Sequence, residues 1–374
     1  MYFLGKSFVR NLLKKRIILN SMGKMKRNFC VGESGAINKE KLLMSHYPRF
    51  EKSISDIVDT CDPSRAGKHI EEVLDYTTAG GKKTRGKLLV AAFEEIAPKD
   101  KLTEEMFTLA AYLGWCVEAF HGLILIMDDI MDGSLTRRGQ TCWYRRPNIQ
   151  MSAINDAVML DAAIYEFLHE KFHHLPTYAD IIHSYHRNAL MLYMGQYLDV
   201  LAMQQDVLTF TMEQCRRNVI HKGSHYTIYS PIELAYNLAG YKDLQPLVDA
   251  KDLIYEMGIF FQAQDDFLDC YGDPKVMGKI GTDIEDGKCT WLVATFLSRA
   301  NEAQKDILKK FYGKNNEESV TQIKKLYEEV GIFEAFKNYE DKTYKDIKWK
   351  IQEAKGIPKN VCQGLMDKLY KRNI

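Results

Sequence analysis

The sequence contains few of the residues that interrupt helices or form zinc and disulfide patterns. Nine prolines are thinly spread over 374 residues, and no Gly/Ser-rich or repeated tract accompanies them, so neither linkers nor solenoid repeats are evident. The eight cysteines lie far apart without a Cys-x-x-Cys pair, which argues against a zinc site and is typical of reduced, mostly buried thiols. These absences favour one continuous domain in a reducing compartment.

Net charge and long apolar runs are also lacking. Fifty-one Lys and Arg side chains balance fifty Asp and Glu side chains, which argues against a nucleic-acid or general polyanion binder. No apolar run approaches the ~20 residues that a membrane-spanning helix needs, since even 107–127 contains Glu118 and His121. We therefore expect a soluble, cytoplasmic protein without a transmembrane segment.

Strand-like alternation is nearly absent, and helical periodicity dominates from about residue 38 onward. Apolar residues recur at three- and four-residue steps in 102–132, 152–173, 177–204, 207–239, 244–271, 291–312 and 318–355. Short stretches with Gly or Pro separate these segments. We predict an all-α fold in which a single large helical bundle occupies residues 38–374.

Residues 1–37 form a basic N-terminal extension. Eight Lys and Arg residues stand among the first 32, interleaved with apolar residues, and no acidic residue precedes Glu33. This composition suits an organellar targeting segment, although serine is scarce. A disordered basic tail is the alternative interpretation.

Two acidic motifs carry the chemistry of the sequence. The apolar run 123–127 ends in Asp-Asp-Ile-Met-Asp (128–132), and Asp-Asp-Phe-Leu-Asp (265–269) follows a similar apolar approach. In a helix the first and last carboxylates of each motif share one face. Carboxylate pairs suit Mg²⁺, which takes one or two of them and leaves other positions to water and phosphate. The candidate metal ligands are Asp128, Asp129, Asp132, Asp265, Asp266 and Asp269.

Basic residues accompany these acids in three groups. Lys82, Lys83, Arg85 and Lys87 surround a predicted helix start after two glycines, where exposed N–H groups favour an anion. The pair 137–138 is Arg-Arg and follows the first acidic motif; Lys279 and Lys288 follow the second, and Lys222 lies between the motifs. Alternating acids and bases of this kind indicate a diphosphate held through metal ions and through direct Arg and Lys contacts.

Other interpretations of these motifs are less favourable. One acidic helix end is more often a solvated, salt-bridged surface than a metal site, but the same spacing occurs twice, each time between an apolar helix and a Gly/Lys/Arg loop. A calcium loop is excluded because Ile130 or Phe267 stands at its third position and Gly139 or Val276 at its twelfth. The Gly-Gly-Lys stretch lacks the spacing of a Walker loop. A shared metal and diphosphate site is therefore favoured.

The ordered set of motifs resembles the farnesyl diphosphate synthases, which are short-chain trans-prenyltransferases of the isoprenoid synthase fold. The matching motifs are Gly-Gly-Lys-x-x-Arg-Gly (80–86), the two acidic motifs, Arg-Arg-Gly (137–139), Gly-Gln (195–196), Lys222, Phe-Phe-Gln (260–262) and Gly-Lys-Ile-Gly-Thr-Asp (278–283). The resemblance implies a homodimer of all-α subunits, each with a deep central cavity and three Mg²⁺ ions. It also implies a transferase that joins isopentenyl diphosphate to dimethylallyl, geranyl or farnesyl diphosphate.

The resemblance assigns roles to individual residues. Lys82, Arg85, Arg138 and His121 correspond to the isopentenyl diphosphate site, although the family usually has Gln at the position of His121. Arg137, Lys222, Gln262, Lys279 and Lys288 correspond to the allylic diphosphate ligands, and Arg137, Lys222 and Gln262 are the candidate catalytic residues. Gly223 stands where the family usually has Thr.

Product length is expected to depend on Leu123 and Ile124. The family commonly has aromatic residues at these positions, the fifth and fourth before the first acidic motif, where they form the cavity floor. Smaller aliphatic side chains would let the chain grow further, because a hydrophobic pocket discriminates one methylene by only ~1–3 kcal/mol. We therefore predict a mixture of farnesyl and geranylgeranyl diphosphate.

Two functions of other classes remain open. A terpene cyclase acting on a single allylic diphosphate would share the first motif, but would usually have a divergent second motif and no isopentenyl clamp. A non-catalytic helical scaffold would need the motifs to be relics, whereas all six carboxylates are present. The sequence favours the prenyltransferase.

Overall fold

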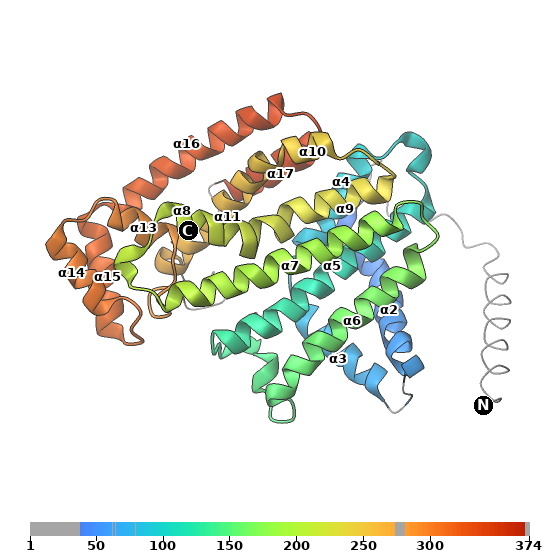
Figure 1. Cartoon of the computed structure of the whole chain (residues 1–374), viewed down its shortest axis with the longest axis horizontal. Helices are drawn as coiled ribbons and strands as arrows, with labels where there is room; N and C mark the ends of the chain where they lie inside the picture. Colours follow the sequence, from blue (N-terminus) through green and yellow to red (C-terminus); the bar gives the residue numbers. More distant parts are fainter. Residues whose placement is uncertain (1–37, 62, 64, 79, 274–280, 371–374) are drawn as a thin grey trace.

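The computed structural model describes residues 38–61, 63, 65–78, 80–273 and 281–370, and within them the protein is helical apart from one small hairpin (Figure 1). The α-helices are α2 (Lys39–Cys61), α3 (Ala66–Thr78), α4 (Thr84–Ile96), α5 (Glu104–Met131), α6 (Ala153–Phe172), α7 (Tyr178–Met203), α8 (Met212–Val219), α9 (Ser230–Ala239), α10 (Gln245–Asp249), α11 (Lys251–Tyr271), α13 (Trp291–Leu297), α14 (Glu302–Phe311), α15 (Glu317–Glu329), α16 (Ile332–Glu353) and α17 (Lys359–Leu369). Short 3-10 helices cover Lys99–Lys101, Trp143–Arg145, Gln150–Ser152 and Val207–Thr209, and a π-helix, η5, covers Ile220–Tyr229. The predicted all-α fold is confirmed. The N-terminal extension 1–37 lies outside the described residues.

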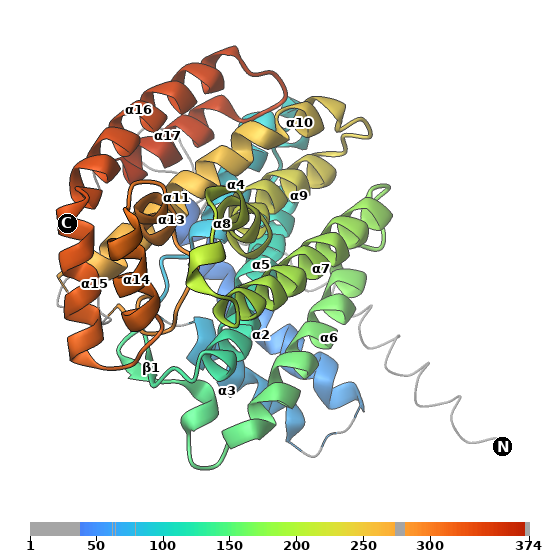
Figure 2. The same cartoon turned by 60° about the vertical axis from the view of Figure 1, so that its left-hand side comes forward.

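Two apolar cores organise the helices. The first surrounds α5 and receives buried side chains from α2, α3, α4, α6, α7 and α9, while the second lies beneath α13 to α16. Helix α11 belongs to both, because Ile254 and Phe260 pack in the first core and Ala263 and Phe267 in the second. The second acidic motif therefore begins where α11 passes from one core to the other. Figures 1 and 2 show α14 and α15 together at one end of the molecule.

Four of the predicted helical segments are divided in the structure, among them 244–271, which forms α10 and α11. The segment 318–355 breaks at Gly331, whose backbone is left-handed with φ of 68°, a conformation that glycine adopts without steric cost. The segment 291–312 breaks before Asn301, which starts α14 with a capping box to Gln304. The segment 207–239 contains η5 between α8 and α9. Local capping and backbone conformation end these helices where hydrophobic periodicity continues.

Helix α5 is the central apolar element. Its length and composition would allow it to cross a membrane, so the expectation that Glu118 and His121 interrupt its apolar run is wrong. However, 83% of its most apolar window is buried inside the protein. Glu118 is itself buried and accepts a hydrogen bond from the backbone N–H of Gly86 at 2.8 Å. A buried polar group with a hydrogen-bond partner is compatible with a core helix. Because α5 is packed on most sides by protein, little of its surface could contact lipid.

A small hairpin follows α5 and presents two arginines. Strands β1 (Thr136–Arg137) and β2 (Gln140–Thr141) pair antiparallel, with Arg137 opposite Gln140. Arg138 and Gly139 form the turn and both have positive φ, 52° and 76°. The turn sends the Arg137 side chain toward the end of α5 and the Arg138 side chain toward the end of α3.

Candidate active site

A cavity of about 640 Å³ lies between the C-terminal ends of α5 and α11, and α7, η5 and the segment before α13 complete its walls. Its acidic lining residues are Asp128, Asp132, Asp199, Asp265, Asp266, Asp269, Asp283 and Asp286. Its basic lining residues are Arg85, Arg137, Lys222 and Lys288. The two acidic motifs therefore face one cavity, although they lie far apart in the sequence.

Asp128, at the end of α5, is the centre of a charged network. It accepts a hydrogen bond from the Gln196 amide at 2.9 Å and forms ion pairs with Lys222 at 3.1 Å and Arg137 at 3.2 Å. Lys222 also contacts Asp199 at 2.5 Å. The network joins α5, α7, η5 and the hairpin through a single carboxylate.

Opposite charges decide the ionisation of this network. Burial opposes charge on Asp128, but Lys222 and the Gln196 hydrogen bond outweigh it and hold the pKa of the Asp128 carboxyl at about 2. Burial likewise opposes charge on Lys222, and the nearby Asp128 and Asp199 outweigh it and raise the pKa of its ammonium. Both groups are therefore charged at neutral pH, as a site that binds an anion through cations requires.

The other two carboxylates of the first motif are paired as well. The Arg137 guanidinium donates to Oδ1 of Asp129 from Nε at 2.9 Å and from Nη2 at 2.5 Å. Lys288 donates to Asp132 at 3.0 Å and lies 3.9 Å from Asp283. Each carboxylate of the first motif thus has a cationic partner from another element.

All three carboxylates of the second motif line the cavity, and Asp266 is also hydrogen-bonded to the protein interior. Asp266 is only 5% exposed and accepts hydrogen bonds from the Gln262 amide at 2.9 Å and from the backbone N–H of Trp291 at 2.8 Å. Burial raises the pKa of Asp266 to about 7, against the effect of these two donors. Asp266 therefore holds the start of α13 against α11, while Asp265 and Asp269 also line the cavity.

The donor set suits magnesium. Carboxylate oxygens without sulfur or imidazole partners are the ligands that Mg²⁺ prefers, and Mg²⁺ commonly completes its shell with phosphate oxygens. Within the part of the chain that the structure describes, no three His, Cys, Asp or Glu side chains are gathered closely enough to hold an ion by themselves. The residues present therefore fit metal ions that are shared between carboxylates and a phosphate ligand.

Arg85 connects the cavity to the region around His121. Its guanidinium donates to the hydroxyls of Tyr226 and Thr227, the latter at 2.9 Å, and lies over the Tyr226 ring at 4.2 Å. The Tyr226 hydroxyl is also 3.5 Å from Nδ1 of His121. Burial, together with the charges of Arg85 and Arg138, lowers the pKa of His121, so its imidazole is neutral.

The remaining predicted diphosphate ligands lie in different surroundings. Arg138 lines a smaller pocket of about 30 Å³ beside the main cavity and donates to the backbone carbonyl of Thr77 at 2.8 Å. Lys82 is exposed at the protein surface. Lys279 lies outside the described residues. The structure thus brings Arg85 to the main cavity and Arg138 to its neighbour, and it does not place Lys82 in either lining.

Asp199 is a cavity residue that the motifs did not single out. It follows Gln196 by three positions on α7, so both side chains lie on the same face and reach the network around Asp128. The Gly-Gln pair at 195–196 was the available signal, and helical spacing from Gln196 would have found the carboxylate. Asp286 was missed for a different reason, because it lies in a loop without periodicity.

The predicted chain-length residues are packed in the core. Leu123 is fully buried and Ile124 is 4% exposed, and neither lines the cavity. The cavity therefore ends before it reaches them in this conformation.

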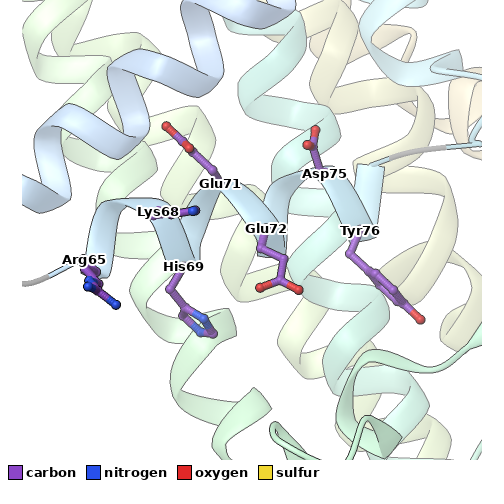
Figure 3. Close-up of a pocket in the computed structure, with 7 residues that line it drawn as sticks. All are labelled: Arg65, Lys68, His69, Glu71, Glu72, Asp75 and Tyr76. Carbon is purple, nitrogen blue, oxygen red and sulfur yellow. The ribbon is translucent and has the colours of Figure 1, made fainter.

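A second hollow, of about 630 Å³, lies along α3 and differs from the cavity (Figure 3). Glu71 and Asp75 point to one side of the helix, and Glu72 and Tyr76 to the other. Several of its side chains tie α3 to neighbouring elements: His69 contacts Asp156 at 2.7 Å, Glu72 contacts Arg146 at 2.7 Å, and Asp75 accepts from Tyr47 at 2.7 Å. These contacts hold α3 against its neighbours, so we interpret the hollow as part of the helix packing and not as a binding site.

An all-α bundle with two carboxylate motifs facing across a cavity, ringed by Arg and Lys, defines a class of enzymes that bind organic diphosphates with magnesium. A sequence profile described as polyprenyl synthetase matches residues 67–330 of the chain. The chain is 38% identical over 341 residues to farnesyl pyrophosphate synthase of Rattus norvegicus, covering 90% of this chain and 97% of that protein. It is 42% identical over 307 residues to the enzyme of Homo sapiens, covering 81% and 73% respectively.

Solved structures give the same result. Farnesyl diphosphate synthase of T. brucei, complexed with risedronate, superimposes with a TM-score of 0.82 at 29% identity, covering 90% of this chain and all of that one. The chain belongs to the farnesyl diphosphate synthase family of polyprenyl synthetases, and it is a prenyltransferase with the isoprenoid synthase fold. The resemblance and the fold inferred from the sequence are confirmed.

Proposed function

We propose that the protein condenses isopentenyl diphosphate with allylic diphosphates to form farnesyl diphosphate. The observation that carries the proposal is the cavity in which Asp128 of α5, Asp132 directly after α5 and Asp265 of α11 line the same space as Arg137, Lys222 and Lys288. Carboxylates supply ligands for metal ions, and the cations supply direct contacts for diphosphate oxygens. Family membership supports the same substrates.

Magnesium would be held by Asp128, Asp132 and Asp265, with support from Asp129, Asp266 and Asp269, and three ions are expected per site. When bound, it neutralises the allylic diphosphate and stabilises it as a leaving group. Arg137, Lys222 and Lys288 now pair with carboxylates of the site. We infer that metal binding to these carboxylates frees the three cations to contact the diphosphate, since each carboxylate can then pair with metal instead.

The condensation follows from this arrangement. The allylic carbon–oxygen bond breaks and its electron pair leaves with the diphosphate, so the allylic group becomes a cation. The double bond of isopentenyl diphosphate attacks that cation, and a proton then passes to the departing diphosphate. Arg85 and Arg138, with His121 as a neutral hydrogen-bonding group, would hold the diphosphate of isopentenyl diphosphate. Tyr226 and Phe261 line the cavity and limit the access of water to the cation.

The geranylgeranyl product is a finer proposal. Its support is the aliphatic character of Leu123 and Ile124, and the burial of both residues outside the cavity lining means that the cavity must extend to accommodate a longer chain. The curated relatives described above are named as farnesyl synthases. We therefore place farnesyl diphosphate first.

A product assay tests the function. The protein is incubated with isopentenyl diphosphate and, separately, with dimethylallyl, geranyl or farnesyl diphosphate, with and without Mg²⁺, and product chain length is read by mass. We expect Mg²⁺-dependent farnesyl diphosphate from the dimethylallyl and geranyl primers. Extension of the farnesyl primer would establish the geranylgeranyl product, and its absence would remove that part alone. Hydrocarbon released from an allylic diphosphate without condensation would identify a cyclase and contradict the proposal.

We further propose that the protein acts as a homodimer through α6 and α7. Large apolar side chains are exposed at helical spacing along both helices: Ile154 and Val158 on α6, and Leu190, Met194, Tyr197 and Leu201 on α7. Two neighbouring helices with such faces form a continuous patch of the kind that protein interfaces cover. A second copy of the chain supplies the same patch, so the contact is self-complementary.

The N-terminal extension decides the compartment in this proposal. Residues 38–374 form the prenyltransferase domain, and residues 1–37 are a separate basic segment. The acid-poor, basic composition of that segment supports import into an organelle. A cytoplasmic location is expected if it is not recognised.

A further inference from the structure

Lys83 lies in the turn between α3 and α4, and the roles assigned above do not include it. Its backbone is left-handed, with φ of 50°, directly before the first residue of α4, and few residues other than glycine adopt this conformation. The side chain is half-buried, and its ammonium donates a hydrogen bond to the backbone carbonyl of Thr78, the last residue of α3. The lysine therefore turns back into the protein and closes the turn that contains it.

Two cations bind the same helix end. The last carbonyls of a helix have no partner within it and carry partial negative charge. At the end of α3, the carbonyl of Thr78 accepts from Lys83, and the carbonyl of Thr77 accepts from Nη1 of Arg138 at 2.8 Å. Lys83 and Arg138 come from different segments, so α3 sets their positions relative to one another.

The turn also contacts Arg138 directly. A Cβ atom placed on Gly81 would lie 2.8 Å from Nη2 and 2.9 Å from Cζ of Arg138, so a side chain at this position would have to displace the guanidinium. The glycine thus lets the guanidinium of Arg138 lie against the turn. The bond from Lys83 to Thr78 spans this turn and holds it.

The surroundings of these residues favour an anion. Burial lowers the pKa of Lys83, with opposition from Glu118 and a further lowering by Arg138. The charges of Arg85, Arg138 and Lys83 all act on the half-buried imidazole of His121. Cations that are brought together and partly desolvated gain from binding an anion between them.

We propose that Lys83 is a positioning residue of the isopentenyl diphosphate site, because its bond to Thr78 holds the Gly81 turn beneath the guanidinium of Arg138. This rests on the proposed function, in which Arg138 binds the diphosphate of isopentenyl diphosphate. The allylic diphosphate is expected at Arg137, Lys222 and Lys288, which line the main cavity, whereas Lys83 is not among its lining residues. Loss of the ammonium should therefore weaken the binding of one substrate only.

Steady-state kinetics of the full chain tests this. Lys83→Gln removes the charge and keeps an unbranched side chain, and Lys83→Arg retains the charge. The matched control is Lys39→Gln on α2, which removes a half-buried lysine that pairs with Glu94 at 2.5 Å. In Lys83→Gln we expect the KM for isopentenyl diphosphate to rise about tenfold, as for the loss of one charge-assisted hydrogen bond. The KM for the allylic substrate and kcat should change less than about twofold, Lys83→Arg should restore most of the loss, and Lys39→Gln should have no effect.

Other results overturn the proposal. An unchanged KM for isopentenyl diphosphate, an equal rise in both KM values, or the same effect in Lys39→Gln would each do so. Lys83→Asn guards against misfolding, because Asn tolerates left-handed backbone; it should give the same rise in KM with an unchanged Tm. If the unaltered chain forms no condensation product, the proposed function itself fails. If it does, and the variants match it, only the role of Lys83 fails.

Discussion

Lys222 joins two carboxylates of the site, one on α5 and one on α7. Its ammonium contacts Asp128 at 3.1 Å and Asp199 at 2.5 Å, and it helps to hold the pKa of Asp128 at about 2. An opposite charge close to a carboxylate favours its ionised form, and so the lysine favours the charged form of Asp128. The same ammonium lines the cavity. When metal binds to the carboxylates, the ammonium would contact a diphosphate oxygen instead.

Replacing Lys222 by Met should affect catalysis more than folding. We expect kcat/KM for the allylic substrate to fall by about 10²- to 10³-fold, as for removal of one group that stabilises developing charge. The pKa of Asp128 should rise because its nearest cation is lost, but the carboxyl should stay ionised at neutral pH. Because Mg²⁺ then no longer competes with the ammonium for Asp128, the Mg²⁺ concentration for half-maximal rate should not increase. Steady-state kinetics with varied Mg²⁺ measures both effects.

Lys242→Met is the matched control, since Lys242 pairs with Asp180 at 3.1 Å on the surface. Exposed ion pairs contribute little, about 0–1 kcal/mol. Equal losses in both variants, or full activity in Lys222→Met, would contradict the role of Lys222.

At the scale of elements, η5 is fixed by glycines on both neighbouring helices. A Cβ on Gly195 of α7 would lie 2.6 Å from Cα of Lys222, and a Cβ on Gly258 of α11 would lie 2.6 Å from Cα of Ser224. The π-helix Ile220–Tyr229 thus packs backbone to backbone between α7 and α11. π-helical turns often occur at functional sites, and this one brings Lys222 and Tyr226 to the cavity.

Gly258→Ala should therefore destabilise the protein by about 1–3 kcal/mol, the usual cost of overpacking, and displace η5. Gly364→Ala is the control: Gly364 lies within α17, where a Cβ would meet nothing within 4 Å. That change should stabilise the protein by about 0.5–1 kcal/mol, because alanine is the better helix former. Thermal unfolding of both variants measures the difference, and a stable Gly258→Ala protein would contradict the close packing of η5.

At the scale of the whole molecule, the apolar patch of α6 and α7 stands apart from the cavity. The exposed fraction of Tyr197 on α7 is 66%, and that of Val158 on α6 is 55%. Helix α16 lies on the opposite side of the molecule from α6 (Figure 1) and also exposes a large side chain, Trp349, at 66%. Among the exposed residues of α16, Trp349 has no large apolar neighbour on its own face. A single exposed aromatic ring is normal on a protein surface and does not indicate an interface.

Tyr197 and Trp349 give a matched test of the dimer. Tyr197→Glu should weaken the dimer by at least about tenfold in Kd, because it places a charge in an apolar interface. Trp349→Glu should leave it unchanged, although the exposed area is similar. Light scattering across a dilution series measures the mass of each variant. A monomeric unaltered protein, or equal effects of both substitutions, would contradict the interface on α6 and α7.

The sequence by itself determined the helical class and the acidic motifs. Period and composition are local properties, so the ends of α5 and α11 could be found from spacing alone, and the motif set identified the family. Local pattern did not reveal the breaks at Gly331 and Asn301, because capping and left-handed backbone end a helix without changing its hydrophobic period.

Only the tertiary structure decided which side chains meet. Asp199 joins Lys222, and Asp266 turns inward to the N–H of Trp291, because α7, η5, α11 and α13 pack together, and no spacing along the chain encodes those distances. Likewise Lys82 and Lys83 are neighbours in sequence, yet the left-handed backbone of Lys83 brings its ammonium to the end of α3, while Lys82 is exposed. Side-chain direction in a turn depends on φ and on the partners that packing supplies, which is why the site could be located from the sequence but its contacts could not.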